Sequence, residues 1–324
     1  SGDLIDGRDA TQGLSIIAHD GDDTVYGSNY SDTISDGYGD DTIYGMDGND
    51  TFIVGSGGDT FDGGAGTDTL IINWSSSLPD DWTKENYGVI NLQEGTGSST
   101  VNPTSSLNDI YLSIENYFQT GSNGANYMVI GSDVNNILST SLGDDIIDGG
   151  AGNDKLYGNE GDDTLKSGSG DDKLYGGSGN DILEVTGSGH QYFDGGEGND
   201  IVVGNDRYND GADDTSTEDN LYGEAGNDSL YGTASDNILD GGTGSDTIYT
   251  GNGSDTIVLR VGDGGSTLAA ADTITDFADG SDKLGMDNNL LFSELTIAQG
   301  TGSNSSDTII SKGSEYLAIL TGIS

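Results

Sequence analysis

Apolar side chains recur along most of this chain at intervals of nine residues, each two places after an acidic or amide residue. Val25, for example, follows Asp23, and the same pair repeats every nine residues up to Leu70. The pattern returns from Asp145 and again from Asp219, with a glycine-rich run before each acidic position. This period is too long for a helical turn and too regular for a loop. It indicates an array of short structural repeats.

Each nine-residue unit predicts a turn followed by a very short strand. The unit 149–157 reads Gly-Gly-Ala-Gly-Asn-Asp-Lys-Leu-Tyr, and the unit 176–184 follows the same pattern. Because side chains alternate along a strand, Leu156 should point inward and its two neighbours outward. Glycine supplies positive φ angles and lets backbone carbonyl groups approach closely. We therefore predict stacked three-residue strands joined by tight turns.

The ionic balance of the chain excludes several classes of partner. With 57 Asp and Glu against 9 Lys and Arg, the net charge is −48, which repels nucleic acids and anionic membranes. The chain has no cysteine, so disulfides and thiolate sites are excluded, and no apolar stretch approaches the roughly 18 residues of a membrane span. Only 31% of the residues are hydrophobic. Such a chain should stay disordered unless divalent cations bind it.

The acidic turns have the chemistry of a calcium site. Calcium takes six to eight oxygen ligands at about 2.3–2.6 Å. One Asp and several carbonyl groups from a single turn supply about half of that shell, so two adjacent turns would complete it. Without the ion, carboxylates stacked at a strand spacing of about 4.8 Å repel one another. We therefore expect metal binding and folding to be one equilibrium.

The pattern G-G-x-G-x-D-x-U-x, where U is apolar, resembles the repeat of the RTX (repeats-in-toxin) family, over residues 14–71, 136–203 and 219–258. The resemblance implies an all-β fold, a right-handed parallel β-roll (β-helix) with two nonapeptides per coil and calcium ions between consecutive turns. It also implies that the Asp at position six of each unit is the side-chain ligand, with backbone carbonyls completing the shell. The implied metal ligands are Asp23, Asp32, Asp41, Asp50, Asp59, Asp68, Asp145, Asp154, Asp163, Asp172, Asp181, Asp200, Asp219, Asp228, Asp246 and Asp255.

Interruptions of the period divide the chain into six segments. We expect a first β-roll block at 1–71, a non-repeat insert with a degenerate lead-in at 72–135, a second block at 136–205, an acidic loop at 206–218, a third block at 219–258, and a C-terminal β cap at 259–324. The cap should include or adjoin the secretion signal that the resemblance implies. Its strand-like stretches are Leu290–Ile297, Asp307–Ser311 and Tyr316–Leu320. A cap is needed because the last coil would otherwise expose unpaired strand edges.

Catalytic motifs are missing from this sequence. His19 precedes Asp20 and His190 precedes Gln191, so there is no H-E-x-x-H zinc-protease motif, and G-x-S-x-G does not occur. Tandem acids such as Asp22 and Asp23 recur at positions five and six of the repeat, which favours a structural role over acid-base catalysis. We therefore predict a chain that is not itself an enzyme.

The resemblance implies a calcium-binding segment of a secreted or cell-surface bacterial protein, such as an adhesin or surface-layer component. Its calcium-free chain would pass the type I secretion machinery unfolded and fold outside the cell. One alternative is that the outer face binds ice, a glycan or another surface protein, since threonine fills position seven throughout the first block. Another is that the chain is the C-terminal region of a secreted protease, lipase or epimerase whose catalytic domain precedes Ser1.

Overall fold

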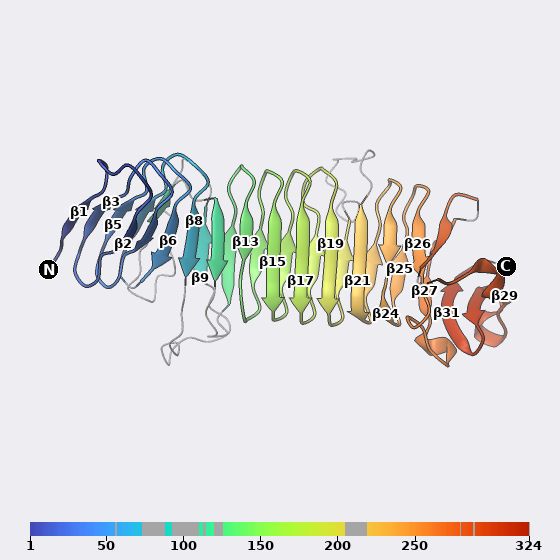
Figure 1. The fold of residues 1–324 in the computed structure, drawn as a ribbon. Coiled ribbons are helices and arrows are strands. Elements are labelled where there is room, and N and C mark those ends of the chain that lie inside the picture. Colours follow the sequence, from blue (N-terminus) through green and yellow to red (C-terminus); the bar gives the residue numbers. More distant parts are fainter. Residues whose placement is uncertain are drawn as a thin grey trace. The chain divides into compact units, whose positions relative to one another are not determined.

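The computed structural model describes residues 1–55, 57–72, 88–92, 110–112, 115–119, 126–204, 219–278, 280–287 and 289–323. The chain divides into two compact units, Ser1–Glu160 and Gly161–Ser324. Each is a parallel β-solenoid of short strands (Figure 1). Helical residues within the described ranges form three short 3-10 turns, η2 (Leu268–Ala270), η3 (Phe292–Glu294) and η4 (Gly302–Asn304). The predicted all-β parallel roll is confirmed.

The first unit contains three parallel ladders. The first runs β1 (Leu4–Asp6), β3 (Thr24–Tyr26), β5 (Thr42–Tyr44), β7 (Thr60–Asp62) and β10 (Ile110–Leu112). The second runs β2 (Ser15–Ile17), β4 (Thr33–Ser35), β6 (Thr51–Val54), β8 (Thr69–Ile72), β11 (Asn116–Gln119), β13 (Ile137–Ser139) and β15 (Lys155–Glu160). The third runs β9 (Gly88–Asn91), β12 (Tyr127–Ile130) and β14 (Ile146–Asp148).

Strands pair with the next strand but one, so two nonapeptides form one coil. Val25 of β3 lies opposite Ile43 of β5, eighteen residues later. The second ladder also passes through the segment predicted as an insert, because Asn116 of β11 lies opposite both Thr69 and Ile137. Trp74, Trp82, Pro79 and Pro103, which the sequence places in this segment, lie outside the described residues.

The core of the first unit is the column of inward-pointing residues at position eight. Val25, Ile43 and Phe61 are fully buried, and so is Tyr117 of β11. The first and second ladders face each other across the core, where the rings of Phe52 and Phe61 pack edge to face with centroids 5.6 Å apart. Each fully buried side chain of this kind contributes about 1.5–3 kcal/mol. The sequence period of nine thus arises from two facing columns of apolar side chains, because successive units alternate between the ladders that carry Val25 and Ile34.

The second unit contains two ladders. One runs β17 (Lys173–Ser178), β19 (Tyr192–Glu197), β21 (Asn220–Gly226), β23 (Ile238–Asp240), β26 (Thr256–Leu259) and β28 (Lys283–Met286), with β24 (Thr243–Gly244) paired to β21. The other runs β16 (Thr164–Lys166), β18 (Ile182–Glu184), β20 (Ile201–Val203), β22 (Ser229–Tyr231), β25 (Thr247–Tyr249) and β27 (Asp272–Ile274), followed by β31 (Glu315–Leu320), β30 (Thr308–Lys312) and β29 (Thr296–Gln299).

Coils of unequal length keep one register in the second unit. Lys173 pairs with Tyr192, nineteen residues later, and Tyr192 pairs with Asn220, twenty-eight residues later. The extra residues lie in the connections between successive strands, so they do not interrupt the pairing of the ladder. The predicted acidic loop at 206–218 lies outside the described residues.

The end of the second unit is a small β cap. Strand β31 pairs parallel with β27, and β29, β30 and β31 form an antiparallel sheet over Ala271, Ile309 and Ile319. The strand prediction for 290–297 was largely wrong, because β29 begins only at Thr296. The Leu291 amide donates to the Glu294 carboxylate at 3.1 Å and closes a 3-10 turn instead. No helix in the described ranges is long and apolar enough to cross a membrane.

Candidate metal sites in the stacked turns

The glycine pattern of the turns follows from backbone geometry and from contact with the acidic side chain. In the turn 195–200, Gly196 and Gly198 have φ angles of 100° and 139°, which side chains disfavour. Gly195 needs no such angle, but a Cβ there would lie 2.5 Å from Oδ2 of Asp200. The first glycine of G-G-x-G therefore makes room for the carboxylate, and the second and third form the turn. At position two, residues other than glycine also adopt positive φ angles: His19, Met46, Asn159 and Glu224.

All the predicted aspartates are buried in these turns, each with no more than 2% of its surface exposed. The structure brings them together in files along the edges of the coils. In the first unit the Asp23 amide donates to Oδ1 of Asp41 at 2.7 Å, and the Asp41 amide donates to Oδ1 of Asp59 at 2.8 Å. The opposite edge repeats this contact from Asp32 to Asp50. Each carboxylate is therefore held by the backbone of the coil before it.

The same file exists in the second unit. The Asp181 amide donates to Oδ1 of Asp200 at 2.8 Å, and the Asp200 amide donates to Asp228 at 2.7 Å. Asp228 in turn donates its amide to Asp246 at 2.9 Å. The contact between Asp200 and Asp228 spans twenty-eight residues, so the file does not depend on equal coil lengths.

Other residues continue the files and escaped the sequence prediction. Glu115 accepts the Asp68 amide at 2.6 Å, Asp272 accepts that of Asp246 at 3.1 Å, and Asp282 accepts that of Asp255 at 3.2 Å. Each stands two residues before an apolar residue of a strand: Tyr117, Ile274 and Leu284. That signal alone would have found them, without the period of nine. Amide side chains fill the position at Asn136, Gln191 and Asn237.

The second carboxylate oxygen of many of these aspartates has no hydrogen-bond partner, although it is buried. Oδ2 is in this state at Asp23, Asp41, Asp50, Asp68, Asp181, Asp200, Asp228, Asp246 and Asp255. A buried polar group without a partner costs about 1–3 kcal/mol, and more when it is charged. A file of such oxygens therefore needs protons or cations.

Calcium fits this arrangement because the turns present only oxygen ligands to one another. The carbonyl oxygens of Gly37 and Gly39 lie so close to Gly55 and Gly57 of the next turn that no Cβ would fit there. Fixed carboxylates with one oxygen unpaired, next to inward carbonyls, make up the ligand set that hard cations prefer.

The family of the chain is shown by its repeats. The model of the RTX calcium-binding nonapeptide repeat matches residues 17–52, 35–70, 130–165, 157–184, 185–206, 213–248, 222–257 and 231–264, together more than half of the chain. The chain belongs to the RTX family.

Two solved structures are similar to this RTX chain at low identity. An extracellular lipase from Serratia marcescens is 17% identical, with 63% of this chain and 38% of the lipase covered and a TM-score of 0.29. A hyperactive, Ca²⁺-dependent, β-helical antifreeze protein from an Antarctic bacterium is also 17% identical, with 87% and 86% covered and a TM-score of 0.30. The chain thus spans less than half of the lipase. No curated protein sequence matches it.

Burial shifts the titration of the RTX carboxylates in the ion-free turns. Burial, together with the charges of neighbouring aspartates, raises the pKa of Asp50 and Asp181 to about 7. At Asp228, burial and the charges of Asp246 and Asp200 raise the pKa to about 8. In each case the hydrogen bond from the preceding coil opposes the shift. Ion-free turns therefore favour the protonated form, and a bound dication would favour the ionised form.

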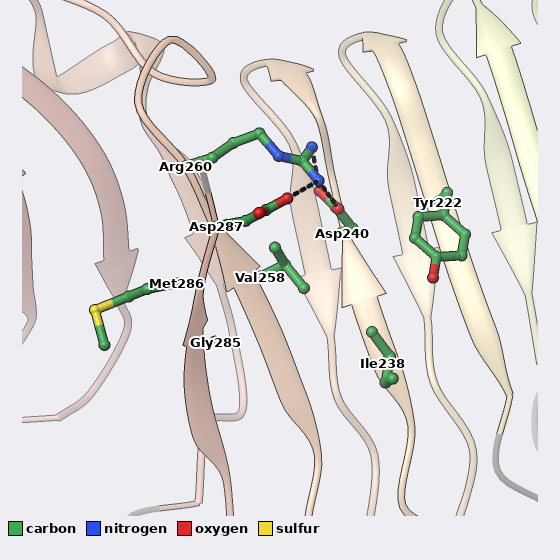
Figure 2. A pocket seen from close by; sticks show the side chains of 8 residues that line it. All are labelled: Tyr222, Ile238, Asp240, Val258, Arg260, Gly285, Met286 and Asp287. Carbon is green, nitrogen blue, oxygen red and sulfur yellow. Dashed lines mark hydrogen bonds and ion pairs between the residues drawn. The ribbon is translucent and has the colours of Figure 1, made fainter. Parts of the chain in front are cut away.

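A shallow hollow lies apart from the RTX turns, on the outer face of one ladder of the second unit (Figure 2). Arg260 donates from both Nη atoms to the carboxylate of Asp240, and its guanidinium lies 3.7 Å from Asp287 and 3.9 Å from Asp263. Three carboxylates thus surround this one cation, so it is not available to an anionic ligand. The hollow is lined by Tyr222, Ile238, Asp240, Val258, Arg260, Gly285, Met286 and Asp287.

Proposed function

We propose that this RTX chain is a non-enzymatic structural module whose stacked aspartates bind calcium, and that it folds when calcium binds after secretion. The observation that carries the proposal is the row of buried Oδ2 atoms without hydrogen-bond partners, as at Asp50, Asp181 and Asp228. Oδ1 of each accepts an amide of the preceding coil, from Asp32, Asp163 and Asp200 respectively, which holds Oδ2 in place for an ion. Carbonyl groups of the same turns would complete the shell.

The net charge explains how calcium would control folding. With a charge of −48 and a core only as wide as the side chains of two facing ladders, the ion-free chain is expanded by its own repulsion. That state suits passage through a type I secretion channel. Outside the cell, millimolar calcium would fill sites with the weak affinity of extracellular modules, about 10⁻⁴–10⁻³ M. The parent would then be a secreted or surface protein such as an adhesin or surface-layer component.

The first experiment follows folding by circular dichroism and hydrodynamic radius in chelator, in calcium and in magnesium. We expect an expanded chain in chelator that gains β signal and becomes compact in calcium. Magnesium at the same concentration should fail, because it demands short octahedral contacts and holds its waters tightly. A chain equally folded in chelator and in calcium would refute the proposal.

The second experiment tests the ligand assignment with Asp228→Asn and the control Asp162→Asn. The asparagine can still accept the Asp200 amide at position 228, while the charge is lost. We expect the calcium-free fold to gain stability, because a buried charge is removed, and the calcium affinity to fall. Asp162 is exposed and stands at position five, so its variant should leave the site affinity unchanged. Equal effects of the two variants would contradict the assignment.

A second candidate function is recognition of ice or a polysaccharide by the outer face. In the first unit Thr24, Thr42 and Thr60 lie in register on adjacent strands. In the second unit the ring centroids of Tyr192 and Tyr222 are 5.3 Å apart, which would suit stacking of sugars. Thermal hysteresis and glycan-array binding would test these activities. The alternative that the parent protein is a secreted enzyme is tested by reading the coding sequence upstream of Ser1.

A further inference from the structure

One turn of the first unit departs from the repeat by burying an additional carboxylate. Asp36 stands at position one of the unit that contains Asp41, where glycine occurs in units such as that of Gly195. The residues at this position one coil before and after are Ala18 and Val54, both buried. Asp36 has no exposed surface. An acidic side chain therefore lies in a column that is otherwise apolar, where burying a charge without compensation is costly.

Local contacts fix the Asp36 carboxylate but satisfy only half of it. Oδ1 accepts the amide of Gly37 at 2.6 Å and that of Gly55, in the next coil, at 2.7 Å. Oδ2 is buried and has no hydrogen-bond partner. It can bond to the Asp59 carboxyl only if one of the two groups is protonated. Asp36 thus points an unsatisfied oxygen toward the space between the two turns.

Three carboxylates meet in this space. One oxygen from each of Asp36, Asp41 and Asp59 lies within 4.8 Å of the others, and among the described residues no other such group of three exists. Two oxygens bound to one calcium ion at about 2.3–2.6 Å can be up to about 5 Å apart. A single ion could therefore contact all three residues with only small shifts of their side chains.

We infer that Asp36, Asp41 and Asp59 form a three-carboxylate calcium site that binds more tightly than the other sites of this chain and fills first. The inference rests on the proposed function and adds a ligand at a position where the repeat has glycine. Calcium affinity rises with the number of charged ligands and with the rigidity of the site. Amides hold all three carboxylates, through Gly37 and Gly55 for Asp36, Asp23 for Asp41, and Asp41 for Asp59.

The experiment compares the calcium isotherms of the full wild-type chain with those of Asp36→Asn and Asp36→Gly, by competition with a chromophoric chelator. Asn keeps the acceptor for the two amides and imitates a protonated Asp36. Gly is the residue at this position in units such as that of Gly195, and it tests the same point if Asn disturbs folding. The control is Asp20→Asn, which removes an exposed charge from the neighbouring turn.

We expect the tightest class of sites to weaken at least tenfold in both Asp36 variants, with the remaining sites and the Asp20 variant unchanged. Isotherms of both Asp36 variants that match wild type would overturn the inference and indicate a proton shared by Asp36 and Asp59. That outcome would leave the proposed function intact, because wild type would still bind calcium. A wild-type chain that binds no calcium would instead overturn the proposed function and the inference with it.

Discussion

Acid should partly replace calcium in holding the fold together. In the ion-free turns, burial raises the pKa of Asp50, Asp145 and Asp181 to about 7 and that of Asp228 to about 8, from 3.8. The folded state therefore binds these protons more tightly than the unfolded state. The resulting stabilisation is complete below pH 3.8 and is lost as pH rises through the folded pKa values.

The size of the effect follows from these pKa values. Between about pH 5.5 and about pH 8, a carboxyl group with a folded pKa of about 7 destabilises the ion-free fold by about 2 kcal/mol, given 1.36 kcal/mol per pKa unit. The summed destabilisation from two or three such groups is a substantial part of an ordinary free energy of unfolding, which is about 5–15 kcal/mol. Calcium binds the ionised form, so the calcium-loaded chain should respond to pH in the opposite sense.

Circular dichroism in excess chelator, read as the folded fraction of the chain, measures this dependence without calcium, and urea unfolding measures it with calcium. The pH range stays above the isoelectric point of about 4.1, so the chain keeps a net negative charge. Without calcium we expect a larger folded fraction at about pH 5.5 than at about pH 8, and with calcium a lower urea midpoint at about pH 5.5 than at about pH 8. Asp228→Asn should reduce the pH dependence of the ion-free chain. Ion-free stability that is constant or rises with pH would refute the reasoning.

Three further predictions concern stability in calcium, measured by urea unfolding. Leu174→Ala empties part of the core file and should cost about 2–5 kcal/mol, whereas Ile182→Ala, on the outer face, should cost under about 1 kcal/mol. Arg260→Met leaves the buried Asp240 carboxylate without its cation and should cost about 3 kcal/mol, less at low pH. Gly195→Ala forces a Cβ against the carboxylate of its own turn and should cost about 1–3 kcal/mol with weaker calcium binding. Equal costs for Leu174 and Ile182, or no pH dependence of the Arg260 variant, would contradict these assignments.

The repeat period was enough to predict the strand and the acidic turn of each regular unit. An apolar residue two places after each Asp predicts both an inward-pointing side chain and the turn before it, and Val25 and Leu174 are both buried. The period could not predict how coils of unequal length pair, because Tyr192 and Asn220 are joined across twenty-eight residues only in three dimensions. Glu115 was not predicted because it is not an aspartate and lies outside the nine-residue spacing, although it accepts the same kind of hydrogen bond from a backbone amide.

Two other features depend on contacts that no repeat pattern encodes. Asp36 occupies a glycine position, and only the stacking of coils shows that it is buried beside Asp41 and Asp59. Near the C-terminus, an apolar run predicted a strand at 290–297, but Glu294 forms a local bond with the Leu291 amide and closes a turn. In both cases one acidic side chain departs from what the surrounding pattern predicts.

Within each unit, every strand of the roll bonds to the equivalent strand one coil earlier or later, as β3 does to β5. Tension applied along such a stack peels off coils one after another and leaves the rest intact. A coil of two nonapeptides would lengthen the chain by about 60 Å when it opens. Bound ions would raise the force needed for each step, so ambient calcium would set how far the segment stretches under load and how readily it recoils.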